Sequence, residues 1–212
     1  MRNLKLIIFD LDGTLVNAYP AIIESFNYAM VRLGYFKQGP LAIRRAVGWG
    51  DISLLKPFIK EKDLRKAIYI YRKHHQKSLL KQSRLFPGTS GLLSYLKGRG
   101  YKLAAASNRP TPFSRILIRH LKLDRYLDYF LCADKLNHGK PHPEILRKIL
   151  RRFSLKPQQA LYVGDMNIDI QAGKRCGIKT IAVTTGSSSP GELRKEGPYR
   201  IIRKIPELKN II

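Results

Sequence analysis

Asp10 and Asp12 stand two residues apart at the end of the apolar run Leu6–Phe9. In an extended strand, side chains at positions i and i+2 point to the same side. Two like charges held there repel each other, so a cation, a shared proton or open water must compensate them. A β-hairpin is the alternative, because Asp-Gly between apolar residues is a strong turn signal. The rest of the chain decides between a reactive carboxylate pair and a turn.

Other polar residues follow apolar runs further along the chain. Ser107 and Asn108 come directly after one such run, and Lys140 stands in the segment GKPHPE. Asp165 comes after another run, and Asp169 follows it by four residues. Each has an ordinary alternative, since serine and asparagine suit turns and aspartate suits the start of a helix. A common location on one edge of a sheet would favour a functional site over these alternatives.

Strands and helices are predicted to alternate through most of the chain. The predicted strands are Leu4–Phe9, Lys102–Ala106, Tyr129–Cys132, Ala160–Val163 and Thr180–Val183. The predicted helices between the later strands are Thr89–Arg99, Pro112–Leu121, Pro143–Phe153 and Asn167–Cys176. This alternation predicts an α/β fold with a parallel, Rossmann-like sheet and helices on both faces. Such sheets bind ligands outside the carboxyl ends of their strands, where all the polar residues above should meet.

One segment breaks this alternation. Residues 18–84 show no convincing strand, only helical patterns such as Ala21–Leu33 and Lys62–Leu80. The sequence therefore predicts an α/β catalytic core made of residues 1–17 and 85–212, with a small helical cap inserted at 18–84. The segment Gly186–Gly191 is predicted to be a flexible loop.

The composition limits the kind of protein. The 212 residues suit one large domain or one domain with an inserted module. Two cysteines form no disulfide framework or zinc pattern, which indicates a reducing compartment. The apolar run at the N-terminus is too short for a signal sequence or a membrane span. We expect a soluble, cytoplasmic monomer or homodimer without a membrane partner.

The chain is strongly basic. Its formal net charge of +25 comes from 40 basic and 15 acidic residues, and predicts attraction to polyanions and anionic small molecules. The basic residues occur as isolated pairs rather than in blocks, which is typical of solvated helix faces. The carboxylates predicted to gather at one edge of the sheet have the opposite charge, and they favour the binding of a hard cation. Mg²⁺ takes oxygen ligands and keeps waters for a phosphate.

At this point the sequence resembles the haloacid dehalogenase superfamily. DLDGT matches its first motif, Ser107 its second, Lys140 its third and GDMNID its fourth, in the family's order and across essentially the whole chain. The segments GDMNIDIQAGKRCGI and RRAVGWG are most similar to the phosphoglycolate phosphatase-like branch. The resemblance implies a phosphatase with a small helical cap.

The resemblance also implies roles for the motif residues. Asp10 would be the nucleophile that attacks phosphorus and becomes an aspartyl-phosphate. Asp12 would protonate the leaving oxygen and then take a proton from the attacking water. Ser107 would hydrogen-bond a phosphoryl oxygen with the Asn108 backbone nearby, and Lys140 would pair with the phosphate and with Asp10.

A metal site is implied as well. Asp165, the Asp10 carboxylate and the Asp12 backbone carbonyl would hold Mg²⁺, while Asp169 would orient the waters on the metal. The implied activity is Mg²⁺-dependent hydrolysis of a small anionic phosphate ester such as phosphoglycolate.

The cap is expected to read the substrate. Arg44 and Arg45 precede Trp49, which lies between two glycines, and these three residues could contact the non-reacting end of an anionic substrate. A core anchor is the alternative for Trp49. The sequence departs from the family pattern in two places. Asn17-Ala18 stands where many relatives have Asp-Ser, which leaves the substrate open but not the chemistry, and Arg109 stands where lysine is common, which keeps the charge.

Two alternative functions remain at this stage. A sugar-phosphate mutase shares the four motifs, but the segment Asn17–Leu33 contains no histidine of the kind such mutases carry in the cap. A nucleic-acid-binding protein or a nucleic-acid 3′-phosphatase would fit the charge. No RNA-binding motif or basic block interleaved with aromatic residues supports it. We therefore expect a phosphatase, with nucleic acid as a less favoured partner.

Overall fold

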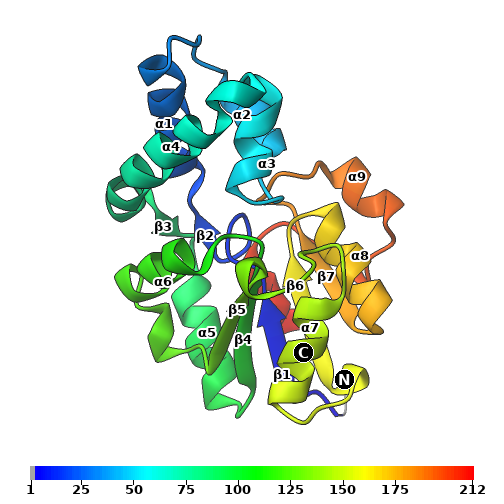
Figure 1. Ribbon diagram of the computed structural model, residues 1–212. Helices are drawn as coiled ribbons and strands as arrows, with labels where there is room; N and C mark the ends of the chain where they lie inside the picture. The colour runs from blue at the N-terminus through cyan, green and yellow to red at the C-terminus, as the bar shows by residue number, and fades with distance from the viewer. Residues whose placement is uncertain (1–2) are drawn as a thin grey trace.

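A six-stranded parallel sheet forms the base of the molecule (Figure 1). The structure is a computed structural model that describes residues 3–212, so residues 1 and 2 of the predicted core lie outside it. The strand order is β5-β4-β1-β6-β7-β8. The strands are β1 (Leu6–Phe9), β4 (Lys102–Ser107), β5 (Tyr129–Cys132), β6 (Ala160–Gly164), β7 (Lys179–Val183) and β8 (Arg200–Ile202). The predicted α/β fold is confirmed.

Helices cover both faces of this sheet because the strand residues alternate between the two faces. In β1, Ile7 and Phe9 pack with residues of α5 and α6, whereas Leu6 and Ile8 pack with residues of α7 and α8. The helices of the core are α5 (Thr89–Gly98), α6 (Thr111–His120), α7 (Glu144–Arg152), α8 (Asn167–Cys176) and α9 (Pro190–Lys195). Short 3₁₀ turns lie at Lys56–Phe58, Leu123–Arg125, Ala133–Lys135, Pro157–Gln159 and Ile205–Asn210.

Four helices stand above the carboxyl ends of the strands (Figure 1). They are α1 (Tyr19–Arg32), α2 (Pro40–Ala46), α3 (Asp51–Leu55) and α4 (Glu61–Gln82). Two short antiparallel strands, β2 (Val16–Asn17) and β3 (Arg84–Leu85), lead into and out of this group. We call the segment between β2 and β3 the cap. The boundaries predicted for it, 17/18 and 84/85, stay a prediction. None of the helices within residues 3–212 is long and apolar enough to cross a membrane.

Several elements were missing from the sequence prediction. Strand β8 has three residues and lies at the sheet edge, so it is too short to show a period. Helices α2 and α3, with seven and five residues, were missed for the same reason. The predicted loop Gly186–Gly191 is wrong at its end, because Pro190 already starts α9. There Ser189 forms a capping box with Glu192, which fixes the start of the helix.

The contact between α8 and β7 gives a stability prediction. A Cβ atom on Gly173 would overlap the Thr180 hydroxyl, whereas a Cβ on Gly91 in α5 would meet nothing within 4 Å. We expect Gly173→Ala to lower the free energy of unfolding by about 1–3 kcal/mol. Gly91→Ala should raise it by up to about 1 kcal/mol, because alanine is the better helix former. Urea denaturation of the two variants would measure both, and equal effects would contradict the close packing.

Candidate active site

The predicted motif residues meet at the carboxyl ends of three neighbouring strands. Asp10 directly follows β1, and its backbone N–H donates to the Val163 carbonyl at 2.8 Å. Ser107 is the last residue of β4, and Asp165 directly follows β6. Because β4 and β6 flank β1, the parallel register brings these residues to one edge. The predicted convergence on one rim is confirmed in the geometry.

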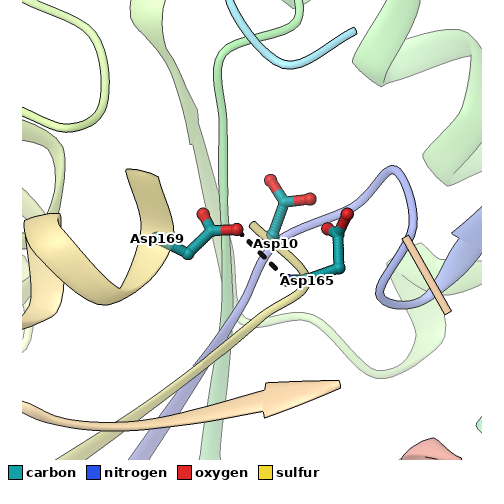
Figure 2. A group of neighbouring side chains, drawn as sticks. All are labelled: Asp10, Asp165 and Asp169. Atoms are coloured by element: carbon teal, nitrogen blue, oxygen red, sulfur yellow. Dashed lines mark hydrogen bonds between the residues drawn. The ribbon is translucent and has the colours of Figure 1, made fainter. Parts of the chain in front are cut away.

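Three carboxylates form the centre of the site (Figure 2). Asp10, Asp165 and Asp169 each offer one oxygen, and these oxygens all lie within 4.8 Å of one another. All three side chains are buried. Asp12 is not part of this group. An all-oxygen donor set of this kind suits Mg²⁺.

Lys140 is the cation that faces this cluster. Its Nζ donates to Asp10 Oδ1 at 2.5 Å, to Asp169 Oδ1 at 2.7 Å and to the Tyr162 hydroxyl at 3.1 Å. Burial works against the charge of Lys140, but Asp10 and Asp169 together raise its pKa well above the usual value. The lysine is therefore charged and fixed between two carboxylates.

Asp169 is held by several donors at once. Besides Lys140, the Tyr162 hydroxyl donates to its Oδ1 at 2.6 Å. The backbone N–H groups of Asp165 and Met166 donate to its Oδ2 at 3.2 and 3.0 Å. Asp169 thus fixes both Lys140 and the turn after β6. Its predicted role in orienting metal-bound waters stays a prediction.

Asp165 is surrounded by small and polar groups. Thr14 Oγ1 donates to its Oδ1 at 3.1 Å, and the Ser187 N–H donates to its Oδ2 at 3.0 Å. A Cβ atom on Gly13 or on Gly186 would overlap the Asp165 carboxylate, so both positions require glycine. Gly13 also adopts a positive φ of 85°. The backbone therefore approaches the Asp165 carboxylate closely at two positions.

The cluster carries more negative charge than Lys140 compensates. Burial raises the pKa of Asp10 to about 7, and Asp169 and Asp12 contribute in the same direction. Burial and the charges of Asp10 and Asp169 hold the pKa of Asp165 well above its usual value. A divalent cation would reverse both effects by favouring the ionised carboxylates. The electrostatics and the donor set therefore fit a metal at this position.

A directional hydrogen-bond network links Asp12 to the cap. Arg109 donates to the two Asp12 oxygens from Nε and Nη2, both at 2.7 Å, and from Nη1 to His75 Nε2 at 2.7 Å. Because arginine only donates, His75 Nε2 must be an acceptor and Nδ1 must carry the proton. His75 Nδ1 lies 3.1 Å from Ser25 Oγ, which can donate in turn to His74 Nδ1, also at 3.1 Å. Burial and Arg109 lower the pKa of His75 well below its usual value, in agreement with a neutral ring.

Ser107 and Asn108 lie beside this network. Ser107 Oγ accepts the Arg109 N–H at 3.1 Å. Asn108 Oδ1 accepts the Lys140 N–H at 2.8 Å, and Nδ2 donates to the Gly48 carbonyl of the cap, also at 2.8 Å. Asn108 therefore joins the loop that carries Lys140 to the cap.

The structure does not bring the three predicted cap residues into the catalytic cavity. Arg44 Nη2 donates to the carbonyls of Thr185 and Gly186 at 2.7 and 2.9 Å, so this side chain ties the cap to the loop after β7. Arg45 is exposed, and Trp49 is 49% exposed, which excludes the core-anchor alternative. Neither arginine nor Trp49 lines the cavity between cap and core. Their role as substrate readers stays a prediction that this placement does not support.

Sequence reasoning missed several residues of the site. Thr14 belongs to the DLDGT motif and could have been found there. Tyr162 lies inside a predicted strand, where an aromatic residue is ordinary. His75 and Tyr19 occur in cap helices with no local signal, because only the tertiary fold brings them to the core.

Comparison with known proteins agrees with this geometry. The family model described as haloacid dehalogenase-like hydrolase matches residues 7–183. The chain belongs to this hydrolase family. The predicted resemblance is confirmed, and the matched region includes both the motif residues and the cap.

This haloacid dehalogenase-like hydrolase is similar to phosphoglycolate phosphatases along its length. It is 32% identical over 183 residues to phosphoglycolate phosphatase from Aquifex aeolicus, with 86% of each chain covered. It is 28% identical over 220 residues to the phosphatase of that name from Nitrosococcus oceani, covering 100% of this chain and 98% of the relative. A crystal structure described as a predicted phosphoglycolate phosphatase from Haemophilus somnus has a TM-score of 0.95 at 27% identity, covering 100% of this chain and 99% of that one.

Proposed function

We propose that this protein is a Mg²⁺-dependent phosphatase that hydrolyses small phosphate monoesters through an aspartyl-phosphate on Asp10. The observation that carries the proposal is the group of Asp10, Asp165 and Asp169, whose oxygens lie within 4.8 Å, with Lys140 bound to one oxygen of Asp10. The similarity of this chain to phosphoglycolate phosphatases makes phosphoglycolate the reference substrate.

Asp10 is placed to act as the nucleophile. Lys140 binds its Oδ1, and within residues 3–212 no group hydrogen-bonds its Oδ2. This leaves one carboxylate oxygen free to attack phosphorus while the lysine lowers the repulsion between the carboxylate and the incoming phosphate. Ser107 lies at the same edge, where its hydroxyl can donate to a phosphoryl oxygen.

Asp12 is the proposed general acid and base. It lies two residues after Asp10, on the edge of the same cavity. Arg109 donates to both Asp12 oxygens, which fixes the orientation of the carboxyl group at the cavity and leaves a lone pair on each oxygen. Asp12 would then protonate the leaving oxygen and later take the proton of the attacking water.

Asp10 and Asp165 would hold Mg²⁺ together with the Asp12 backbone carbonyl, and Asp169 would support them by fixing Lys140. Bound there, Mg²⁺ would neutralise charge on the phosphoryl oxygens and orient the phosphate. The raised pKa values of Asp10 and Asp165 support this assignment, because a buried carboxylate cluster with one lysine lacks positive charge.

The small volume of the cavity favours a small substrate over a polymer. It has a volume of about 60 Å³ and lies between the cap and the core. A mutase would need a cap group that transfers protons to a sugar. His75 does reach the cavity, but Arg109 and Ser25 occupy both of its ring nitrogens. Hydrolysis is therefore the reaction that the site supports best.

Metal dependence tests this function. EDTA should abolish the release of inorganic phosphate from p-nitrophenyl phosphate and phosphoglycolate, and added Mg²⁺ should restore it. Asp165→Asn should raise the Mg²⁺ concentration for half-maximal rate by about tenfold or more, because it removes a ligand charge. Asp63→Asn, on a cap helix, is the matched control and should behave like the wild type. Full phosphate release in EDTA would overturn the metal assignment. With a sugar phosphate as the substrate, isomerised product without phosphate release would indicate a mutase.

A further inference from the structure

We propose that the cavity selects phosphate monoesters with a compact, uncharged leaving group and discriminates against leaving groups that carry a carboxylate or a second phosphate. The proposal rests on the phosphatase function above and names the substrate class of that same site. It departs from the reference substrate, because phosphoglycolate has a carboxylate at its non-reacting end.

The wall that would face the leaving group is mostly apolar. Above the polar floor, the cavity is lined by side chains from the cap and from two core helices. Those with apolar surfaces include Ile22, Val47, Leu54, Tyr71, Phe113 and Ile168. Burying an apolar group against such a wall is favourable, whereas burying an unpaired charge there is costly.

The cations that line this cavity are already paired. Among the residues that the structure describes, Lys140 and Arg109 are the lysine and arginine in its lining. Lys140 Nζ lies between Asp10 and Asp169 at the phosphate end. All three guanidinium nitrogens of Arg109 are bound, two to Asp12 and one to His75. Arg109 keeps one N–H on Nη1 and one on Nη2 without a hydrogen bond among residues 3–212, but the charge of each cation is matched by a carboxylate.

The charged residue that the cap adds to the lining is an anion. Asp51, at the start of α3, is 8% exposed and lines the cavity. Arg72 pairs with it at 2.6 and 3.2 Å, but the Arg72 side chain is 45% exposed and is not part of the lining. An anionic leaving group would therefore meet the Asp51–Arg72 ion pair from its carboxylate side rather than an uncompensated cation.

Tyr71 is another polar group of the wall, and its hydroxyl is neutral. Tyr71 is 3% exposed, and none of the residues in 3–212 hydrogen-bonds its hydroxyl. Burial raises its pKa, so the hydroxyl stays protonated. A neutral hydroxyl can satisfy an ether or alcohol oxygen of the leaving group without a charge.

The size of the cavity limits the leaving group as well. A water molecule needs roughly 10–15 Å³ on the same measure, so the cavity of about 60 Å³ holds a handful of water-sized groups. The phosphoryl group takes part of this space. The leaving group must therefore be small, and a bulky one requires the cap to open.

Two esters of the same shape test the proposal. Isobutyl phosphate replaces the carboxylate oxygens of phosphoglycolate with methyl groups, so the two substrates differ mainly in tail charge. With Mg²⁺, we expect kcat/KM for isobutyl phosphate to exceed that for phosphoglycolate by about tenfold or more, as like-charge repulsion and lost apolar contact both act against the latter. A preference for phosphoglycolate would overturn the proposal while leaving the phosphatase function intact. No Mg²⁺-dependent phosphate release from either ester, or from p-nitrophenyl phosphate, would overturn both.

Variants on the two sides of one ion pair add a second test. Asp51→Asn removes the anion. It should raise the ratio of kcat/KM for phosphoglycolate to kcat/KM for isobutyl phosphate by about three- to tenfold. Arg72→Gln leaves Asp51 unneutralised and should lower that ratio. Both variants lose the same ion pair, so damage to the fold would move the ratio in one direction only. Glu61→Gln, an exposed position ten residues before Tyr71 on α4, is the control and should leave the ratio unchanged. Shifts of the same sign in both variants would contradict the role of Asp51.

Discussion

Asp10→Asn should abolish phosphate release, with a fall in kcat of at least about 10⁴-fold, because the amide cannot act as the nucleophile. The asparagine side chain has nearly the same volume as the aspartate side chain that it replaces. Removal of one buried carboxylate also relieves repulsion from Asp165 and Asp169. The fold should therefore remain intact. Far-UV circular dichroism and the melting temperature would measure this alongside kcat.

The covalent intermediate can be tested separately from turnover. Acid quenching of wild-type protein with radiolabelled p-nitrophenyl phosphate should trap label on the protein, and Asp10→Asn should trap none. Asp124→Asn, on the surface of the core, makes the same chemical change and should keep both turnover and labelling. Substantial turnover by Asp10→Asn would show that another group attacks phosphorus.

The sequence was sufficient for the parts of the fold that repeat a pattern. Strand β1 is preceded and followed by a clear change of polarity, and helix α8 has the predicted bounds Asn167–Cys176. These elements are long or fully buried, so local composition reflects their environment. Strand β8, with three residues, and the β2–β3 pair, with two residues each, have no such period. Their pairing depends on neighbours that are distant along the chain.

The same limit applies to the site. The motif residues were predictable because each follows a strand, and a parallel sheet carries strand ends to one edge. From the sequence, Arg109 was predicted only to keep the charge of the lysine that is common at this position, yet it connects Asp12 to His75. That link joins positions 34 residues apart, and a sequence pattern cannot indicate it. Arg44, expected to face the substrate, instead binds two carbonyls of a core loop.

Lys140→Met should cause the largest loss of stability at a single site. The lysine is 4% exposed and compensates Asp10 and Asp169, so its removal leaves a buried carboxylate cluster without a cation. Removing one partner of a buried ion pair costs about 3–5 kcal/mol. Activity should also fall sharply, since the same ammonium group reduces repulsion between Asp10 and the phosphate. Urea denaturation in EDTA would measure the change in the free energy of unfolding.

A second lysine in the same chain provides the matched control. Lys148 pairs with Glu144 at 2.9 Å, but its side chain is 44% exposed. Lys148→Met should change the free energy of unfolding by no more than about 1 kcal/mol, because water screens exposed pairs. The loss of stability in Lys140→Met is expected to come from the buried carboxylates that it leaves without a cation. Adding Asp169→Asn to Lys140→Met should therefore recover part of that stability, since one uncompensated charge disappears. Equal losses in the two lysine variants, or no recovery in the double variant, would mean that Lys140 contributes packing rather than charge. That outcome would also weaken the case for Mg²⁺, because a cluster that tolerates the loss of its lysine does not require a second cation.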